Sequence, residues 1–362
     1  MGKAILLLED GTTFVGRSFG AEGEQVGEVV FNTSMTGYQE ILTDPSYRGQ
    51  MVVMTYPLIG NYGVHSEESE SERLWLSGLI VKEYVDVPAQ GMMAPLAPFL
   101  IQHGIVAMSG IDTRALTRRI RRAGAMPAIL STQRFETQEL LETLAASPTL
   151  IGRDLVREVT SQEPQTWSVG TEDAPHVVVY NFGVKHNILR RLAGHGCRLT
   201  VVPADTPASA VLALRPHGVL LSNGPGDPEA LTYAIRTVER LLDKVPIFGI
   251  CLGHQILGIA LGGRCMKLKF GHHGGNHPVR ECATGHVLIT AQNHNFSIDC
   301  ACIEKNVEIT YTSLNDQTVE GLRHRTLPVS SVQFHPEAAP GPHDAHHLFD
   351  GFLNDMKRVG PC

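Results

Sequence analysis

The segment Val245-Pro-Ile-Phe-Gly-Ile-Cys-Leu-Gly-His-Gln255 places one cysteine between two glycines directly after an apolar run. Its first six residues predict a short buried strand, and the apolar residues from Gln255 to Gly262 predict a buried helix. Cys251 then falls at the sharp strand-to-helix junction that is typical of a nucleophile elbow. The glycines two positions before and after it leave room for the turn.

A histidine and a carboxylate follow a second predicted strand, Ser331 to Phe334. In His335-Pro-Glu337 the offset of two residues along an extended segment directs both side chains to one side, and the proline stiffens the backbone. Taken alone, the tripeptide is also compatible with an ordinary turn. Together with the elbow, it predicts a triad for acyl transfer in which Cys251 attacks, His335 is the base and Glu337 orients the imidazole.

The predicted elbow also supplies the groups that such a reaction needs. A cysteine attacks as the thiolate, which a paired histidine and a helix N-terminus both favour. The oxyanion formed by the attack requires N–H donors fixed in advance. The backbone amide of Leu252 is the natural first donor, and Gly224, in the loop Asn223-Gly-Pro-Gly-Asp-Pro228, is the candidate for the second.

Composition describes an ordinary globular protein. Its 362 residues are enough for two domains, and a formal net charge of -7 argues against nonspecific nucleic-acid binding. No segment approaches the length of a membrane span, and the N-terminal apolar run is too short for a signal peptide. The seven cysteines all lie from Cys197 onward without paired zinc spacing, which predicts reduced thiols in a cytoplasmic protein.

The chain changes character near its middle. Residues 1–157 are rich in strands and turns and predict a separate β-rich α+β domain, with strands over 4–8, 27–31 and 50–55 and helices over 95–103 and from Asp112 to Gly124. The polar segment 158–175 predicts a linker. Residues 176–362 predict an α/β domain with a parallel sheet whose strand ends carry the site. Its expected strands are 176–180, 199–202, 219–222 and 246–250, and its expected helices are 184–194, 207–214 and 228–244.

Three motifs resemble those of class I glutamine amidotransferases: the elbow around Cys251, the loop 223–228 and His335-Pro-Glu337. The first half narrows the resemblance, because residues 27–47, Gly60-Asn61 and 111–117 are similar to the carbamoyl-phosphate synthetase small subunit family. The segments 269–278 and 291–294 match that family too. The similarity covers nearly the whole chain.

The resemblance implies hydrolysis of L-glutamine to glutamate and ammonia through a thioester on Cys251. It implies no cofactor in this chain and a heterodimer with a large subunit, which uses ATP, magnesium and bicarbonate to make carbamoyl phosphate for arginine and pyrimidine biosynthesis. We expect the large subunit to dock on the first domain, residues 1–157. By motif match, the residues that hold glutamine would be Ser46, Gly224, Gly226, Leu252, Gln255, Asn293, Asn295 and Phe296. Asn295 departs from the glycine usual in the family, and we expect the contact to survive because asparagine tolerates a left-handed backbone.

Three alternatives stay open at this point. The histidines at 272, 273, 277, 343, 346 and 347 invite a metal site, although their spacings match no standard one and we predict none. A scaffold that has lost turnover would keep the fold without activity. A cysteine peptidase or another amidase would keep the triad and cleave other substrates.

Four arginines between Arg118 and Arg122 form a last candidate feature. They are most simply a solvated helix face, and a surface for a partner is the sharper interpretation.

Overall fold

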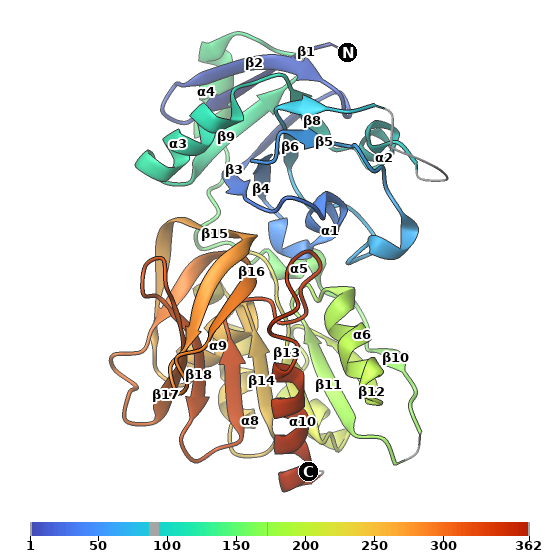
Figure 1. Cartoon of the computed structure of the whole chain (residues 1–362), viewed down its shortest axis with the longest axis vertical. Coiled ribbons are helices and arrows are strands. Elements are labelled where there is room, and N and C mark those ends of the chain that lie inside the picture. Colours follow the sequence, from blue (N-terminus) through green and yellow to red (C-terminus); the bar gives the residue numbers. More distant parts are fainter. Residues whose placement is uncertain (1, 87–93, 172, 361–362) are drawn as a thin grey trace. The chain divides into compact units, whose positions relative to one another are not determined.

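A computed structural model describes residues 2–86, 94–171 and 173–360 (Figure 1). The chain divides into two compact units. The first unit contains Met1–Arg153 and Lys269–Gly274, and the second contains Asp154–Leu268 and Gly275–Cys362.

The first unit is built on a closed barrel of strands in the order β1-β2-β8-β6-β4-β3-β9. Alternate residues of these strands pack in two directions: one set meets Leu116 and Ile120 of α3, and the other meets the helices α1, α2 and α4. The elements are β1 (Lys3–Leu8), β2 (Thr13–Ser18), β3 (Glu24–Asn32), β4 (Gln50–Met54), β6 (Gly78–Ile80), β8 (Val106–Ser109), β9 (Met126–Ser131), α1 (Tyr38–Thr43), α2 (Leu96–Gln102), α3 (Thr113–Ala123) and α4 (Thr137–Ala145), with the short pair β5 (Leu58–Ile59) and β7 (Glu83–Tyr84) and the 3-10 turns η1 (Pro45–Tyr47) and η2 (Ser66–Glu68).

Local sequence signals account for α3. The Asp112 carboxylate accepts a hydrogen bond from the Ala115 amide at 2.8 Å, as an N-cap does, and Gly124 ends the helix with a φ of 110°. The predicted strands and both predicted helices of this unit are therefore confirmed, with their ends moved by a few residues.

The second unit is a ten-stranded sheet in the order β10-β12-β11-β13-β14-β19-β18-β17-β15-β16. Strands β12, β11, β13, β14 and β19 are parallel, and β18, β17 and β15 continue the sheet in antiparallel fashion. The strands are β10 (Gln165–Ser168), β11 (His176–Asn181), β12 (Arg198–Pro203), β13 (Gly218–Leu221), β14 (Ile247–Ile250), β15 (Arg264–Glu281), β16 (Val287–Asp299), β17 (Val307–Ser313), β18 (Val319–His324) and β19 (Val329–Val332).

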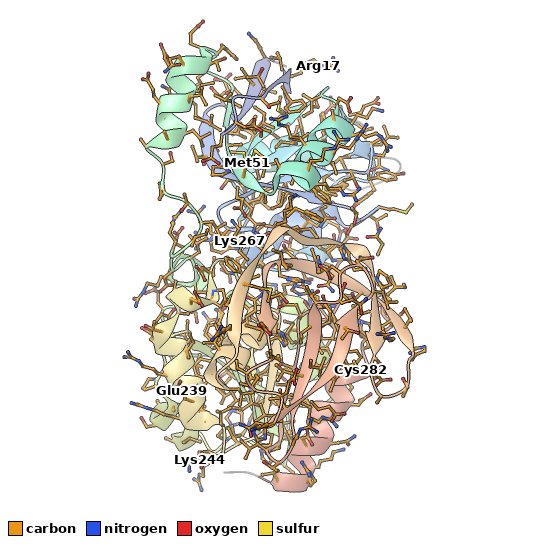
Figure 2. All side chains as sticks on the ribbon, turned by 90° about the vertical axis from the view of Figure 1, so that its left-hand side faces the viewer. Arg17, Met51, Glu239, Lys244, Lys267 and Cys282 are labelled. Carbon is orange, nitrogen blue, oxygen red and sulfur yellow. The ribbon has the colours of Figure 1, made fainter. Side chains whose placement is uncertain are left out.

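Helices cover both faces of this sheet. One face packs against α5 (Val156–Val159), α7 (Ala208–Ala213), α8 (Thr232–Leu241) and α9 (Leu252–Ala260), and the other against α6 (His186–Gly194) and α10 (Leu348–Val359). The turn η3 (Pro228–Ala230) precedes α8. Figure 2 shows the side chains, with Glu239 on the exposed side of α8. This arrangement confirms the predicted class, an α/β domain with a parallel sheet and a separate β-rich α+β domain.

One prediction for the second unit differs from the structure, and one pair of strands was not predicted. The segment 158–175, predicted as a linker, contains β10, which pairs antiparallel with β12 at the edge of the sheet. Its residues Gln165–Ser168 are mostly exposed, so they carry no apolar pattern that would reveal a strand; residue 172 in this segment lies outside the described residues. The long hairpin of β15 and β16 was also missed.

No helix within residues 2–86, 94–171 and 173–360 has the length and apolar character needed to cross a membrane.

Candidate active site

Cys251 lies at the elbow between β14 and α9. Its φ of 54° and ψ of -103° lie outside the usual regions for a non-glycine residue, so the backbone there is strained. The helix begins at Leu252, three residues before the predicted start, because Gly253 belongs to its first turn and not to a loop.

The two flanking glycines are required by close backbone packing. A Cβ at Gly253 would lie 2.2 Å from the Leu221 carbonyl oxygen, and one at Gly249 would lie 2.7 Å from the Gly253 carbonyl oxygen. A side chain at Gly253 would therefore push α9 away from β13, and one at Gly249 would push α9 away from β14. The glycine pattern that marked Cys251 in the sequence has this steric origin.

Strand pairing brings the predicted base to the elbow. Strand β19 lies parallel to β14, with Ile250 opposite Val332, and the Cys251 amide donates to the Val332 carbonyl at 2.9 Å. His335 follows β19 by three residues, so its side chain and that of Cys251 come from the carboxyl ends of neighbouring strands.

His335 and Glu337 form a buried pair. His335 Nδ1 lies 2.6 Å from Glu337 Oε1, and the two side chains are 3% and 0% exposed. Burial alone lowers the pKa of His335, but the carboxylate of Glu337 and the neighbouring Cys251 outweigh it and raise this pKa to about 10. His335 Nε2 is buried and makes no hydrogen bond with any described residue, which leaves it as the nitrogen for proton transfer.

Lys185 is a further member of the site that the sequence analysis missed. Its Nζ lies 2.9 Å from the same Oε1 of Glu337, and it also donates to the Ala338 carbonyl. Burial raises the pKa of Glu337, but Lys185 and His335 outweigh it and lower this pKa to about 2. Lys185 therefore keeps Glu337 ionised inside the protein.

A usable signal for Lys185 was present in the sequence. It follows β11 by four residues, at the same carboxyl edge that supplies Cys251 and the loop after β13. The Lys185 amide donates to Asn223 Oδ1 at 3.1 Å, which ties these two loops together.

The thiol of Cys251 donates to the Asn293 carbonyl of β16, with 3.5 Å between Sγ and the oxygen. Transfer of its proton to His335 therefore requires a rotation about the Cα–Cβ bond toward Nε2, a change between staggered rotamers. Catalytic hydrogen bonds are commonly looser without substrate than with it.

Gly224 and Leu252, the residues predicted to supply the oxyanion donors, pack against each other. A Cβ at Gly224 would lie 2.8 Å from Leu252 Cδ2 and 2.2 Å from the Phe182 carbonyl oxygen, so only glycine fits there. The Gly253 amide is bonded to the Ser222 carbonyl at 3.0 Å. The Leu252 amide is the first of α9 and has no acceptor within the helix, which suits it to an oxyanion.

The other residues predicted to hold glutamine divide between the units. Gly226, with a φ of 89°, follows β13, and Asn293, Asn295 and Phe296 lie on β16. Ser46 belongs to η1 of the first unit, where its amide donates to Asp44 Oδ1 at 2.9 Å.

Gln255 of α9 is already engaged within the second unit. Its Nε2 donates to the Phe296 carbonyl at 2.8 Å and to Gln333 Oε1 at 3.1 Å. Both amide hydrogens are used by these bonds, so a substrate group would meet the carbonyl oxygen of Gln255.

The backbone of Asn295 is not in the left-handed conformation that we expected there. It lies within β16 and its φ is not positive, so a left-handed backbone plays no part there. The physical reason given for tolerating asparagine was therefore wrong, although the expectation that the contact survives stays a prediction.

Three other histidines make ordinary structural contacts. Burial lowers the pKa of His254 to about 3, and its Nδ1 lies 2.9 Å from Ser331 Oγ, so this neutral imidazole connects α9 to β19. His343 Nδ1 and His346 Nε2 are 3.1 Å apart near the surface. Two imidazoles supply fewer ligands than a structural zinc site, so this pair gives no support to a metal centre.

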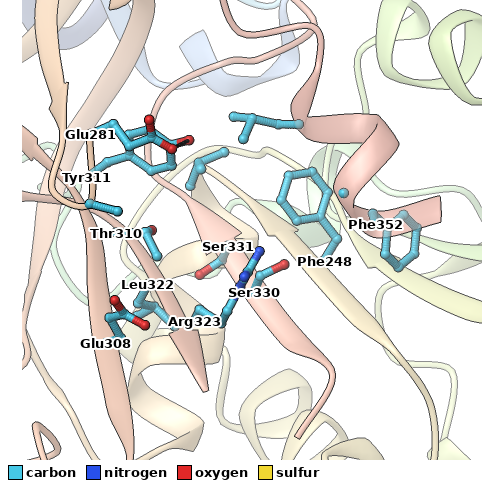
Figure 3. Close-up of a pocket in the computed structure, with 14 residues that line it drawn as sticks. Phe248, Glu281, Glu308, Thr310, Tyr311, Leu322, Arg323, Ser330, Ser331 and Phe352 are labelled. Atoms are coloured by element: carbon cyan, nitrogen blue, oxygen red, sulfur yellow. Dashed lines mark hydrogen bonds between the residues drawn. The ribbon is translucent and has the colours of Figure 1, made fainter. Parts of the chain in front are cut away.

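A separate cavity of about 160 Å³ lies in the same unit, between the strands β14, β17, β18 and β19 and the helix α10 (Figure 3). Phe248, Tyr311 and Phe352 line its apolar part, and Glu281, Glu308 and Arg323 line its polar part. No member of the triad lines it, so it is not the catalytic site.

The elbow cysteine, the buried histidine–glutamate pair and the adjacent amide donors define a class I glutamine amidotransferase domain. Residues 177–355 match the family described as "Glutamine amidotransferase class-I", and residues 6–130 match "Carbamoyl-phosphate synthase small chain, CPSase domain". The chain belongs to the carbamoyl-phosphate synthase small chain family.

Full-length relatives agree with this assignment. The chain is 54% identical to the carbamoyl phosphate synthase small chain of Syntrophotalea carbinolica and 52% identical to that of Chlorobaculum tepidum, with 98% of each chain covered in both comparisons. It is 48% identical to the chloroplastic small chain of Oryza sativa, over 99% of this chain and 83% of the relative.

Proposed function

We propose that this chain hydrolyses L-glutamine to glutamate and ammonia, which a large synthetase subunit uses with bicarbonate and ATP to make carbamoyl phosphate. The observation that carries the proposal is the pairing of β14 with β19, which sets Cys251 beside His335 and its partner Glu337. The relatives' names imply a second, larger chain. ATP and magnesium would be used by that chain, for arginine and pyrimidine biosynthesis.

The reaction follows from the site. His335 Nε2 takes the proton of Cys251, and the thiolate attacks the side-chain amide carbon of glutamine. The amides of Leu252 and Gly224 hold the oxyanion, and His335 then returns the proton to the leaving nitrogen, which departs as ammonia. Water, activated by His335, hydrolyses the thioester and releases glutamate with a free thiol.

Glutamine would be held by the carbonyl oxygen of Gln255, by the β16 segment with Asn293, Asn295 and Phe296, and by Gly226. The motif match also assigns Ser46 to glutamine binding. The described cysteines are all free thiols, which supports a reducing compartment and hence the cytoplasm.

The test is ammonia release from glutamine by the purified chain, alone and with its large chain. Cys251→Ser should abolish release, whereas Cys302→Ser, which alters an exposed cysteine, should leave it unchanged. Unchanged release by Cys251→Ser would overturn the proposal. Cleavage of peptides in the same experiment would favour the peptidase alternative.

A further inference from the structure

A hollow of about 730 Å³ in the first unit is lined by four basic side chains. Lys82, Arg114, Arg118 and Arg121 surround it, and we call it the basic hollow. Its one acidic lining residue is Asp112, whose Oδ1 is used to cap α3. The lining is therefore strongly positive, although the whole chain carries a net charge of -7.

The helix α3 presents these arginines in a fixed direction. Leu116 and Ile120 are fully buried, and they hold one side of the helix against the barrel. Arg114, Arg118 and Arg121 recur at intervals of four and three residues, so they share the other side and are exposed.

The four cations have no acidic partner within the part of the chain that the structure describes. Arg119 on the same helix shows the contrast, because its guanidinium pairs with Asp10 at 2.5 Å. Like charges three and four residues apart on a helix repel one another, and a carboxylate brought into the hollow would relieve that repulsion.

We infer that the basic hollow docks an acidic segment of the large synthetase subunit, an inference that rests on the proposed function for the existence of that partner. Guanidinium groups bind carboxylates through paired hydrogen bonds, and three of the four cations are arginines. The cationic groups are exposed around the hollow, which suits a segment of a protein surface more than a small enclosed ligand.

The first test compares two double charge reversals. Arg118→Glu/Arg121→Glu changes the hollow, and Arg236→Glu/Arg240→Glu makes the same charge change at two exposed positions of α8. At low salt the first variant should bind the purified large chain at least about tenfold more weakly, mainly through slower association, and the control should bind like the wild type. Equal dissociation constants for the two variants would overturn the inference.

Ammonia release by the free chain separates this inference from the proposed function. Both double variants should release ammonia from glutamine at the wild-type rate without the large chain, because neither changes the triad. If the wild type itself releases none, the proposed function fails first.

A second test uses the wild-type chain and needs no substitution. Lys82 should become protected from acetylation when the large chain binds, whereas Lys244, at the labelled position in Figure 2, is 52% exposed and should stay reactive. Equal reactivity of Lys82 with and without the partner would contradict docking here. Protection by pyrophosphate but not by the large chain would show a site for small anions and would also overturn the inference.

Discussion

Replacement of Lys185 by methionine tests how the buried charges of the site are balanced. The side chain is 3% exposed, and its Nζ lies 2.9 Å from Glu337 Oε1. Without it, His335 is the one charged partner that the carboxylate of Glu337 keeps among the described residues. Removing one partner of a buried ion pair typically lowers the free energy of unfolding by about 3–5 kcal/mol, because the remaining charge stays buried.

The pKa of Glu337 gives a second estimate of the free energy that the Lys185–Glu337 pair contributes to folding. Folding lowers it from 4.5 to about 2, which corresponds to about 3 kcal/mol of folding free energy, shared between Lys185 and His335. This stability is present above pH 4.5 and is lost as the pH falls toward 2. We expect Lys185→Met to lower the free energy of unfolding at pH 7 by about 2–4 kcal/mol.

Urea unfolding at pH 7 measures this loss, and a double-mutant cycle assigns it. Adding Glu337→Gln to Lys185→Met removes the stranded charge, so the double variant should be more stable than Lys185→Met alone. A Lys185→Met protein as stable as the wild type would contradict the stabilising role of the Lys185–Glu337 pair, and so would a double variant no more stable than Lys185→Met.

Three further predictions concern the elbow, the base and β16. Gly253→Ala should destabilise the second unit strongly, because its Cβ would meet the Leu221 carbonyl oxygen at 2.2 Å. The control Gly194→Ala has open space around the new Cβ and should be neutral or slightly stabilising in thermal unfolding. Equal melting temperatures for the two variants would contradict this prediction. Folding raises the pKa of His335 from 6.5 to about 10, so its stabilising contribution is complete below pH 6.5 and is lost toward pH 10. The difference in free energy of unfolding between the wild type and His335→Gln should therefore shrink between pH 6.5 and pH 10. A constant difference would count against the His335–Glu337 pair. Asn295→Gly should leave KM for glutamine within a few-fold of the wild type, and a large improvement in steady-state kinetics would show that asparagine impairs the site.

Much of the second unit could be predicted because its signals are local. The elbow is marked by Gly249 and Gly253, which close packing of the backbone requires. The alternation of buried strands and helices over residues 176–250 then predicts a parallel sheet, whose carboxyl edge collects the site. Local sequence patterns were sufficient for these features.

Other parts of the site make contacts that depend on tertiary pairing, and no local pattern predicts those contacts. The contact of Lys185 with Glu337 joins residues far apart in the chain, and a lone lysine in a loop predicts exposure more often than burial. The use of both Gln255 amide hydrogens depends on Phe296 and Gln333, which the sheet brings to α9. The residues of the edge strand β10 are mostly exposed. The strand therefore has no buried face, and its sequence shows no apolar alternation.

If Cys251 is the nucleophile, it forms a covalent intermediate with glutamine during turnover. The chain can be mixed with glutamine, quenched in acid during turnover and digested, and the peptide that contains Cys251 examined by mass spectrometry. The proposed chemistry predicts a γ-glutamyl thioester on Cys251 that is absent from Cys251→Ser. Continued ammonia release with no adduct on Cys251, and at the same rate in Cys251→Ser, would contradict it.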